Sequence, residues 1–327
     1  LFPFVPLYYA VVFLRNKFYD WSIYKSKTYE FPLLGVGNLS VGGTGKTPMI
    51  EYLITLLDTK YTLATLSRGY GRKSKGFLIA EPNVTSKDIG DEPLQIFNKF
   101  KNITVAVDAD RQQGLKLLKE YKPSLEVVLL DDAYQHRKVT AGFNILLTAY
   151  HQLYCDGIVL PSGDLREPKS GSKRAQVIVV TKCPDHLNST QKDKIKKRLK
   201  PASNQTVFFS SIQYSQKLVS SISSRPLTDL KGIHFTLVTG IANPTPLVCY
   251  LAEMGLDFEH LKFKDHHEFS TSELELIHSK SIVVTTEKDF SRLNPDTNDQ
   301  IYYLPIQLKI DRASEFENLV ETYVEEF

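Results

Sequence analysis

The stretch Ser40-Val41-Gly42-Gly43-Thr44-Gly45-Lys46-Thr47 decides the fold of this 327-residue chain. It stands between an apolar run typical of a β-strand, Pro32 to Val36, and a helical pattern, Pro48 to Leu57. Glycines at such a turn let backbone N–H groups converge on an anion, and the positive end of the helix dipole adds to the attraction. The ending Gly-Lys-Thr is that of a phosphate-binding loop. The sequence therefore predicts that these residues bind the phosphates of a nucleotide.

Two side chains of this loop have expected tasks. In a phosphate-binding loop, or P-loop, the lysine reaches the terminal phosphate and the hydroxyl that follows it holds Mg²⁺, which assigns these tasks to Lys46 and Thr47. Ser40 replaces the first glycine of the usual pattern, but Gly42, Gly43 and Gly45 keep the backbone flexible. A glycine-rich turn without phosphate function is the alternative. We expect the nucleotide and Mg²⁺.

A second acid is expected near the loop, because P-loop enzymes hold Mg²⁺ or its water with a carboxylate from a neighbouring strand. The apolar run Val127 to Leu130 ends in Asp131 and Asp132. In a doubly wound sheet the end of this strand lies beside the phosphate loop. This placement favours a functional pair over two solvated turn residues, and both aspartates are expected to share metal and water contacts.

Short apolar runs alternate with helical patterns over most of the chain. This alternation predicts an α/β fold, a P-loop NTPase-like and mainly parallel sheet with helices on both faces. A shorter second series predicts a smaller α/β domain joined by a short two-stranded linker, with the Ser-rich stretch Ser210 to Ser224 at the boundary. The expected organisation is an N-terminal helix over 1–21, a P-loop domain over 22–205, linker strands over 206–213 and 301–310, the smaller domain over 214–300 and a C-terminal helix over 311–327.

The composition excludes several classes of protein. With 42% hydrophobic and 24% charged residues the chain is neither disordered nor collagen-like. A net charge of +3 is too small for a dedicated nucleic-acid binder, so no nucleic-acid partner is expected. The cysteines Cys155, Cys183 and Cys249 are odd in number and widely spaced, so they form no disulfide framework or zinc site. A reducing, cytoplasmic setting fits this pattern.

The first segment, Leu1 to Leu14, is apolar and aromatic, and Arg15 and Lys17 follow it. It is too short to span a bilayer, which needs about 20 apolar residues. It also lacks the basic start and cleavage site of a secretory signal. Two interpretations remain: a helix buried in the core, or an interfacial helix whose flanking lysines and arginine meet anionic headgroups. The many aromatic side chains favour the interface.

Two familiar classes of P-loop protein fit the sequence poorly. Partition and nitrogenase-type ATPases carry a lysine just before the Gly-Gly pair, where this chain has Val41. Guanine specificity usually rests on Asn-Lys-x-Asp at a strand end, and the nearest segment, Thr181-Lys182-Cys183-Pro184, has proline in place of the aspartate. A metabolic kinase remains, which must also provide an acceptor site.

Several further segments are dense in functional side chains and lie at expected strand ends. They are Ser67-Arg68-Gly69-Tyr70-Gly71-Arg72, Gly90-Asp91-Glu92-Pro93, Asp132-Ala133-Tyr134-Gln135-His136, Leu165-Arg166-Glu167-Pro168, Asp265-His266-His267 and Thr285-Thr286-Glu287-Lys288-Asp289. Together with the phosphate loop, this ordered set resembles the tetraacyldisaccharide 4'-kinases, the lipid A 4'-kinase family of Gram-negative bacteria. The resemblance covers essentially the whole chain.

The resemblance implies transfer of the γ-phosphate of ATP to the 4'-hydroxyl of a tetraacylated glucosamine disaccharide 1-phosphate. The expected location is the cytoplasmic face of the inner membrane, where a monomer bound peripherally or monotopically meets its lipid substrate and an anionic membrane surface. Asp91 and His266 are implied as the dyad that takes the proton of the hydroxyl, with His266 reaching Asp91 on domain closure. Lys46, Asp131 and Asp132 complete the expected catalytic group. The metal candidates are Thr47, Asp131, Asp132 and Glu92, and the substrate candidates are Arg68, Arg111, Gln135, His136, Arg166 and Glu167.

The chain departs from the family pattern in two places. Ala133 and Tyr134 stand where Gly-Leu is more common, and Ser162 and Asp164 stand where the usual segment reads Pro-Ala-Gly-Pro. The Tyr134 ring either contacts substrate or packs. Two other functions stay as alternatives: a P-loop ATPase switch that acts on a membrane partner, and a nucleotide sensor that its first helix recruits to lipid.

Overall fold

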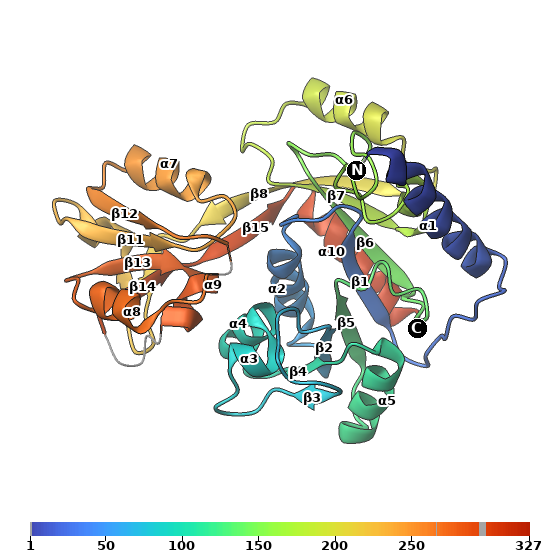
Figure 1. Ribbon diagram of the computed structural model, residues 1–327, viewed down its shortest axis with the longest axis horizontal. Coiled ribbons are helices and arrows are strands. Elements are labelled where there is room, and N and C mark those ends of the chain that lie inside the picture. Colours follow the sequence, from blue (N-terminus) through green and yellow to red (C-terminus); the bar gives the residue numbers. More distant parts are fainter. Residues whose placement is uncertain (1, 266, 294–298) are drawn as a thin grey trace. The chain divides into compact units, whose positions relative to one another are not determined.

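The computed structural model describes residues 2–265, 267–293 and 299–327 of the chain. Two compact units divide it (Figure 1): unit 1 comprises Leu1–Ile212 and Leu308–Phe327, and unit 2 comprises Gln213–Gln307. His266, expected in the catalytic dyad, lies outside the described residues.

Within the described residues, the sheet of unit 1 has nine strands in the order β15-β8-β7-β6-β1-β5-β2-β4-β3, and the last two residues of β8 and the first two of β15 already belong to unit 2. The series from β8 to β4 is parallel, and the short β3 pairs antiparallel with β4. The predicted parallel α/β sheet is thereby confirmed. The strands are β1 (Leu33–Asn38), β2 (Leu63–Ser67), β3 (Leu78–Ile79), β4 (Thr104–Val107), β5 (Val127–Asp131), β6 (Phe143–Ala149), β7 (Val177–Thr181), β8 (Thr206–Tyr214) and β15 (Ile306–Ile310).

Helices cover both faces of this sheet. Consecutive residues of a strand point to opposite faces, so neighbouring residues of β1 pack against different helices. In β1, Leu34 joins the apolar cluster that contains residues of α2, α4 and α10, whereas Leu33 joins the cluster that contains residues of α5. Residues of α6 belong to a third cluster, with side chains of β6 and β7. The helices of unit 1 are α1 (Val5–Asp20), α2 (Lys46–Leu57), α3 (Ser86–Ile89), α4 (Asp91–Lys99), α5 (Arg111–Tyr121), α6 (Ser189–Leu199) and α10 (Ala313–Glu325).

None of the apolar side chains of helix α1 is buried, and several are largely exposed to solvent. Leu7 is 64% and Val11 58% exposed, and Asn16 is the buried residue of the helix. The interpretation of this segment as a buried core helix is therefore wrong. No helix in the described ranges is both long and apolar enough to cross a membrane.

Unit 2 contains a six-stranded sheet within its described part, in the order β10-β9-β14-β13-β11-β12. Strands β12, β11, β13 and β14 run parallel to one another, whereas β9 pairs antiparallel with both β14 and β10. Its elements are β9 (Lys217–Val219), β10 (Ser224–Pro226), β11 (Phe235–Thr239), α7 (Thr245–Glu253), β12 (Phe258–Lys262), α8 (Thr271–His278), β13 (Val283–Thr286), α9 (Glu287–Phe290) and β14 (Ile301–Leu304).

The expected linker strand over 301–310 differs from the structure, which has two strands there. Strand β14 pairs with β13 in the sheet of unit 2, and β15 is the edge strand of the sheet of unit 1. Pro305 separates them, because proline has no N–H group for a strand ladder. Its carbonyl oxygen instead accepts a hydrogen bond of 2.9 Å from the Ser215 N–H.

The C-terminal helix stabilises unit 1, and this provides a first prediction. The fully buried Phe316 ring of α10 lies 5.8 Å from the Tyr52 ring and 5.4 Å from the Phe208 ring. Phe316→Ala should lower the free energy of unfolding by about 3–5 kcal/mol in urea denaturation, because it leaves a cavity. The exposed Ser314 on the same helix provides the control Ser314→Ala, which should stay within about 0.5 kcal/mol of wild type. Equal stabilities of the two variants would contradict the packing described.

Candidate active site

The phosphate loop connects the end of β1 to the first residue of α2. Gly42 and Gly45 have φ angles of 104° and 87°, which residues with a Cβ rarely adopt. Protein donors hold several carbonyl oxygens of the loop. The Thr181 hydroxyl donates to the Thr44 oxygen (2.7 Å) and the Lys182 ammonium to the Gly43 oxygen (2.5 Å). A loop that offers its N–H groups to an anion needs its carbonyl groups held elsewhere in this way.

Asp132 lies between two cations just after β5. The Lys46 Nζ is 3.5 Å from the Asp132 Oδ1, and the Arg166 Nη1 donates to both carboxylate oxygens at 3.1 and 2.9 Å. Burial by itself raises the pKa of Asp132, but Lys46 and Arg166 outweigh it and hold this pKa below its usual value. The carboxylate is therefore charged at neutral pH and links the P-loop lysine to Arg166.

Asp131 is the last residue of β5 and has a different environment. Its side chain is buried (8% exposed), and no hydrogen-bond partner of its Oδ1 lies among the described residues. Burial raises the pKa of Asp131 to about 6, Lys46 opposes the rise, and Asp132 and Glu92 add to it. A buried carboxylate oxygen without a protein partner fits a place beside Mg²⁺ or one of its waters.

No three His, Cys, Asp or Glu side chains in the described part of the chain form a group that could hold a metal ion. The fit to Mg²⁺ therefore rests on few protein ligands. This is the usual arrangement for Mg²⁺ in phosphoryl transfer, where one or two carboxylates, substrate phosphates and waters complete the octahedron. Thr47, in the first turn of α2, places a hydroxyl in the same region.

Asp91 and Glu92 form the first turn of α4, at the positive end of its dipole. The residue before them, Gly90, has a φ of 94°, and a Cβ at this position would lie 2.8 Å from the Tyr70 carbonyl oxygen. Glycine is therefore required where the chain enters α4. The sequence analysis found both acids but not the role of this glycine.

A group of cations surrounds His136. Burial lowers the pKa of His136 to about 4, and Arg111 and Arg68 add to this shift. The imidazole is therefore neutral at neutral pH. Arg111 is only 2% exposed and donates from Nη2 to the Asp131 carbonyl oxygen at 3.3 Å, whereas Arg68 is exposed. Burial also lowers the pKa of Arg111, to about 10.

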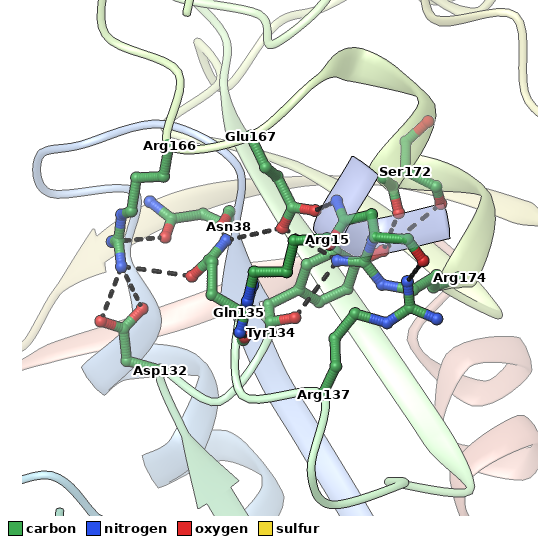
Figure 2. Close-up of polar contacts among 12 residues, drawn as sticks. Arg15, Asn38, Asp132, Tyr134, Gln135, Arg137, Arg166, Glu167, Ser172 and Arg174 are labelled. Atoms are coloured by element: carbon green, nitrogen blue, oxygen red, sulfur yellow. Dashed lines mark hydrogen bonds and ion pairs between the residues drawn. The ribbon is translucent and has the colours of Figure 1, made fainter. Parts of the chain in front are cut away.

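The segments after β5 and before β7 form a hydrogen-bonded cluster (Figure 2). Gln135 donates from Nε2 to the Asn38 carbonyl oxygen (2.8 Å) and to the Glu167 Oε1 (2.9 Å). The Tyr134 ring is buried with the Arg174 guanidinium 4.5 Å from its centroid, and its hydroxyl donates to the Gly171 carbonyl oxygen at 2.8 Å. The alternative in which Tyr134 packs is thus the one observed.

The structure brings together most of the residues that the sequence indicated, and it adds others. Lys46, Asp132 and Arg166 form one connected group, with Gln135 at its edge. Sequence reasoning missed the side chains that hold this group from other elements: Tyr8, Asn16, Asn38, Arg174, Thr181 and Lys182. Thr181-Lys182 carries a signal in the sequence, since the pair follows a predicted strand.

The fold and this loop place the chain among the P-loop enzymes that handle nucleotide phosphates. The family model described as LpxK: Tetraacyldisaccharide-1-P 4'-kinase matches residues 1–325. The chain belongs to the tetraacyldisaccharide 4'-kinase family, which confirms the resemblance seen in its motifs.

Known members of the family are similar over nearly their whole length. A curated relative from Flavobacterium johnsoniae, named Tetraacyldisaccharide 4'-kinase, is 45% identical over 100% of this chain and 97% of its own. A relative of the same name from Bacteroides thetaiotaomicron is 42% identical over 100% of this chain and 93% of its own. The solved structure of LpxK from Aquifex aeolicus, described as an "apo" form in complex with ATP, matches with a TM-score of 0.81 and 29% identity over 99% of this chain and 98% of that chain.

The buried charge of Asp131 leads to a prediction about stability. Because the pKa is raised from 3.8 to about 6, the folded protein binds a proton that the unfolded chain releases between these pH values. Above about pH 6 the charged side chain is therefore destabilising, by on the order of 1–3 kcal/mol. Asp131→Asn should raise the melting temperature of the ligand-free protein at pH 8 while it abolishes activity.

This stability gain has a defined pH dependence. It should be small at about pH 4, grow up to about pH 6 and stay level above, in melting curves recorded with a metal chelator. The exposed Asp193 of α6 provides the control Asp193→Asn, which should show no such profile. A variant Asp131→Asn that is less stable than wild type at pH 8 would contradict the buried, uncompensated charge.

Proposed function

We propose that this enzyme transfers the γ-phosphate of ATP to the 4'-hydroxyl of a tetraacylated glucosamine disaccharide 1-phosphate, a step of lipid A biosynthesis. The observation that carries the proposal is the phosphate loop with Lys46 Nζ 3.5 Å from Asp132 Oδ1, in a chain that belongs to the 4'-kinase family. A P-loop ATPase switch is not favoured, because the relatives named above are all called kinases.

ATP would occupy the loop Ser40 to Thr47. Backbone N–H groups of Gly42, Gly43, Thr44 and Gly45 would surround the β-phosphate at the N-terminus of α2, while the Val41 N–H donates to the Asp164 carbonyl oxygen at 2.7 Å. Lys46 would then hold the β- and γ-phosphates. Charge spreads over the oxygens of the transferred phosphoryl group in the transition state, and a fixed lysine in a partly closed site stabilises that charge.

The acids beside the loop fit a bound Mg²⁺. Thr47, Asp131, Asp132 and Glu92 would hold the ion or its waters, and the unpartnered Asp131 Oδ1 supports this most directly. When bound, Mg²⁺ neutralises charge on the β- and γ-phosphates. Asp132 differs from Asp131 in that Arg166 already binds both of its oxygens. We therefore assign Asp132 mainly to the orientation of Lys46 and of metal-bound water.

Asp91 and His266 would act on the acceptor hydroxyl. Asp91 begins α4, at the positive end of its dipole. A carboxylate that shares a proton with a histidine can accept the proton of a hydroxyl near neutral pH, and general-base help of this kind is worth about 10²–10⁴ in rate. His266 enters this proposal by the family resemblance alone.

Cations around His136 would receive the acceptor and its 1-phosphate. Arg68 is the exposed cation of the group, and His136 is neutral and half-buried, so these two suit direct contact with the sugar phosphate. Gln135 lies at the same edge. Arg111, Arg166 and Glu167 have their side chains bonded to protein groups, and we assign them to holding the site in shape.

The exposed face of α1 would dock the enzyme on the cytoplasmic face of the inner membrane. Phe4, Leu7, Val11 and Leu14 present apolar side chains to solvent, and Trp21 and Ile23 continue this surface beyond the helix. A lipid with four acyl chains stays partly in the bilayer while its sugar enters a site. A peripheral or monotopic enzyme with an apolar helix on its surface meets that requirement.

The central experiment measures phosphate transfer to the lipid. Purified enzyme, γ-labelled ATP, Mg²⁺ and the tetraacylated disaccharide 1-phosphate in micelles should yield lipid with one added phosphate on the distal sugar, detected by mass spectrometry. Lys46→Ala should abolish the product, whereas Lys60→Ala, at an exposed lysine of the same unit, should not. Asp91→Asn and His266→Ala should lower transfer by about 10²–10⁴ with ATP binding kept. Unchanged lipid with steady release of free phosphate would favour the ATPase switch.

Membrane docking is tested separately with vesicles that contain anionic lipid. The double variant Leu7→Glu/Val11→Glu should lose co-sedimentation, because two apolar side chains, each worth about 1.5–3 kcal/mol when buried, no longer enter the bilayer. Both positions are more than half exposed, so folding should be unaffected. Ile222→Glu changes an exposed apolar residue of unit 2 and serves as the control. Equal binding of the double variant and wild type would exclude α1 as the docking element.

A further inference from the structure

Glu167 is a buried carboxylate that the reaction proposed above does not use. It is 2% exposed, and protein groups occupy both of its oxygens (Figure 2). Its Oε1 accepts hydrogen bonds from Gln135 Nε2 at 2.9 Å and Arg174 Nη2 at 2.8 Å. Its Oε2 accepts one from Asn16 Nδ2 at 3.0 Å. A carboxylate engaged in this way acts through its neighbours and not by touching lipid.

On one side, Glu167 is bound to helix α1. Asn16 is the buried residue of that helix, which otherwise exposes much of its apolar surface. Further polar contacts join α1 to the same region. The Tyr8 hydroxyl donates to the Arg166 carbonyl oxygen at 2.9 Å, and Arg15 Nη2 donates to the Gln135 carbonyl oxygen at 3.1 Å. Arg137 donates to the Asn16 carbonyl oxygen at 2.7 Å and pairs with Asp20 at 2.8 Å. The helix is thus attached to the body through the residues that adjoin the phosphate site.

On the other side, Glu167 is bound to the group that holds Asp132. Gln135, which donates to Glu167, also donates to the Asn38 carbonyl oxygen at the end of β1. Arg166 donates to the Asn38 Oδ1 at 2.9 Å and to both carboxylate oxygens of Asp132. An unbroken series of contacts therefore runs from Asn16 through Glu167, Gln135 and Arg166 to Asp132 and Lys46.

We propose that Glu167 is a positioning residue that couples the seating of α1 to the orientation of Asp132 beside Lys46. This inference rests on the function proposed above and adds to it: the helix that meets the lipid also sets the geometry of the phosphate site. A hydrogen bond to a buried charge is costly to leave unmade, so α1 and the site adopt their arrangement together. Residues of this kind, which orient the groups that touch a metal or phosphate, typically change activity 10–100-fold when replaced.

The pair Asn16 and Glu167 allows a test in which the hydrogen bond is reversed. Asn16→Asp places a carboxylate against that of Glu167, so the bond to α1 is lost, while Glu167 still accepts from Gln135 and Arg174. The double variant Asn16→Asp/Glu167→Gln restores the bond, because the amide introduced at position 167 donates to the carboxylate introduced at position 16. Glu317→Gln is the matched control, since Glu317 accepts a bond from Tyr52 elsewhere in unit 1.

Three quantities separate positioning from stability: kcat for phosphate transfer, the Mg²⁺ concentration for half-maximal rate, and the melting temperature. Asn16→Asp should lower kcat about 10–100-fold and raise the Mg²⁺ requirement. The double variant should recover both to within a few-fold of wild type, and Glu317→Gln should change neither. If the bond between Asn16 and Glu167 were purely structural, Asn16→Asp would lower the melting temperature and leave kcat and the Mg²⁺ requirement of the folded enzyme unchanged, which would overturn the inference. The inference would also be overturned if the double variant were as stable as wild type but did not recover the lost kcat.

Failure of the proposed function is recognised separately, as a wild-type enzyme that phosphorylates no lipid. In that case titration calorimetry with MgATP decides the inference. Asn16→Asp should then bind MgATP more weakly than wild type, and the double variant should regain the affinity. Equal affinities of all three proteins would overturn the coupling.

Discussion

The carboxylate of Asp132 lies between the cations of Lys46 and Arg166, and the arrangement of the phosphate site depends on this charge balance. Without the carboxylate, two positive charges would face each other at the end of the central strands. With it, Lys46 Nζ lies 3.5 Å from Asp132 Oδ1, and Arg166 also donates to Asn38 and to the Ser40 carbonyl oxygen. One anion thereby fixes the positions of two cations before any nucleotide is bound, which is the preorganisation that phosphoryl transfer requires.

The neighbouring carboxylate, Asp131, lowers the stability of the folded protein. Asp131 is buried next to Asp132 and leaves one oxygen without a partner among the described residues, and burial raises its pKa. An apolar or amide side chain would be the more stable choice at this strand end. A residue that weakens the fold and offers a buried oxygen beside a phosphate loop is understandable as a ligand whose partner arrives with the nucleotide.

Helix α1 combines two kinds of surface. Several of its apolar side chains are exposed. Its contacts with the body of unit 1 include Asn16, Arg15 and Tyr8, which donate hydrogen bonds to the segments around Gln135 and Arg166. A helix held by apolar burial alone would compete with lipid for the same face. Because directed polar bonds hold this one, the apolar face stays available, and the bonds reach the residues that orient Asp132.

The sequence by itself determined the local features of this protein. The phosphate loop, the alternation of strands and helices, and the placement of Asp131 and Asp132 at a strand end all follow from spacing within a few residues, and the motif set indicated the family. Tertiary structure decided the rest. Glu167 is bonded to Asn16, which lies 151 positions away in sequence, and Arg166 to Asn38, 128 positions away. Such contacts depend on which strands become neighbours in the sheet, which local periodicity does not encode. Tertiary structure also decided that residues 301–310 divide between two sheets. Both halves of this segment favour a strand, and which sheet each half joins depends on the partner strand with which it pairs.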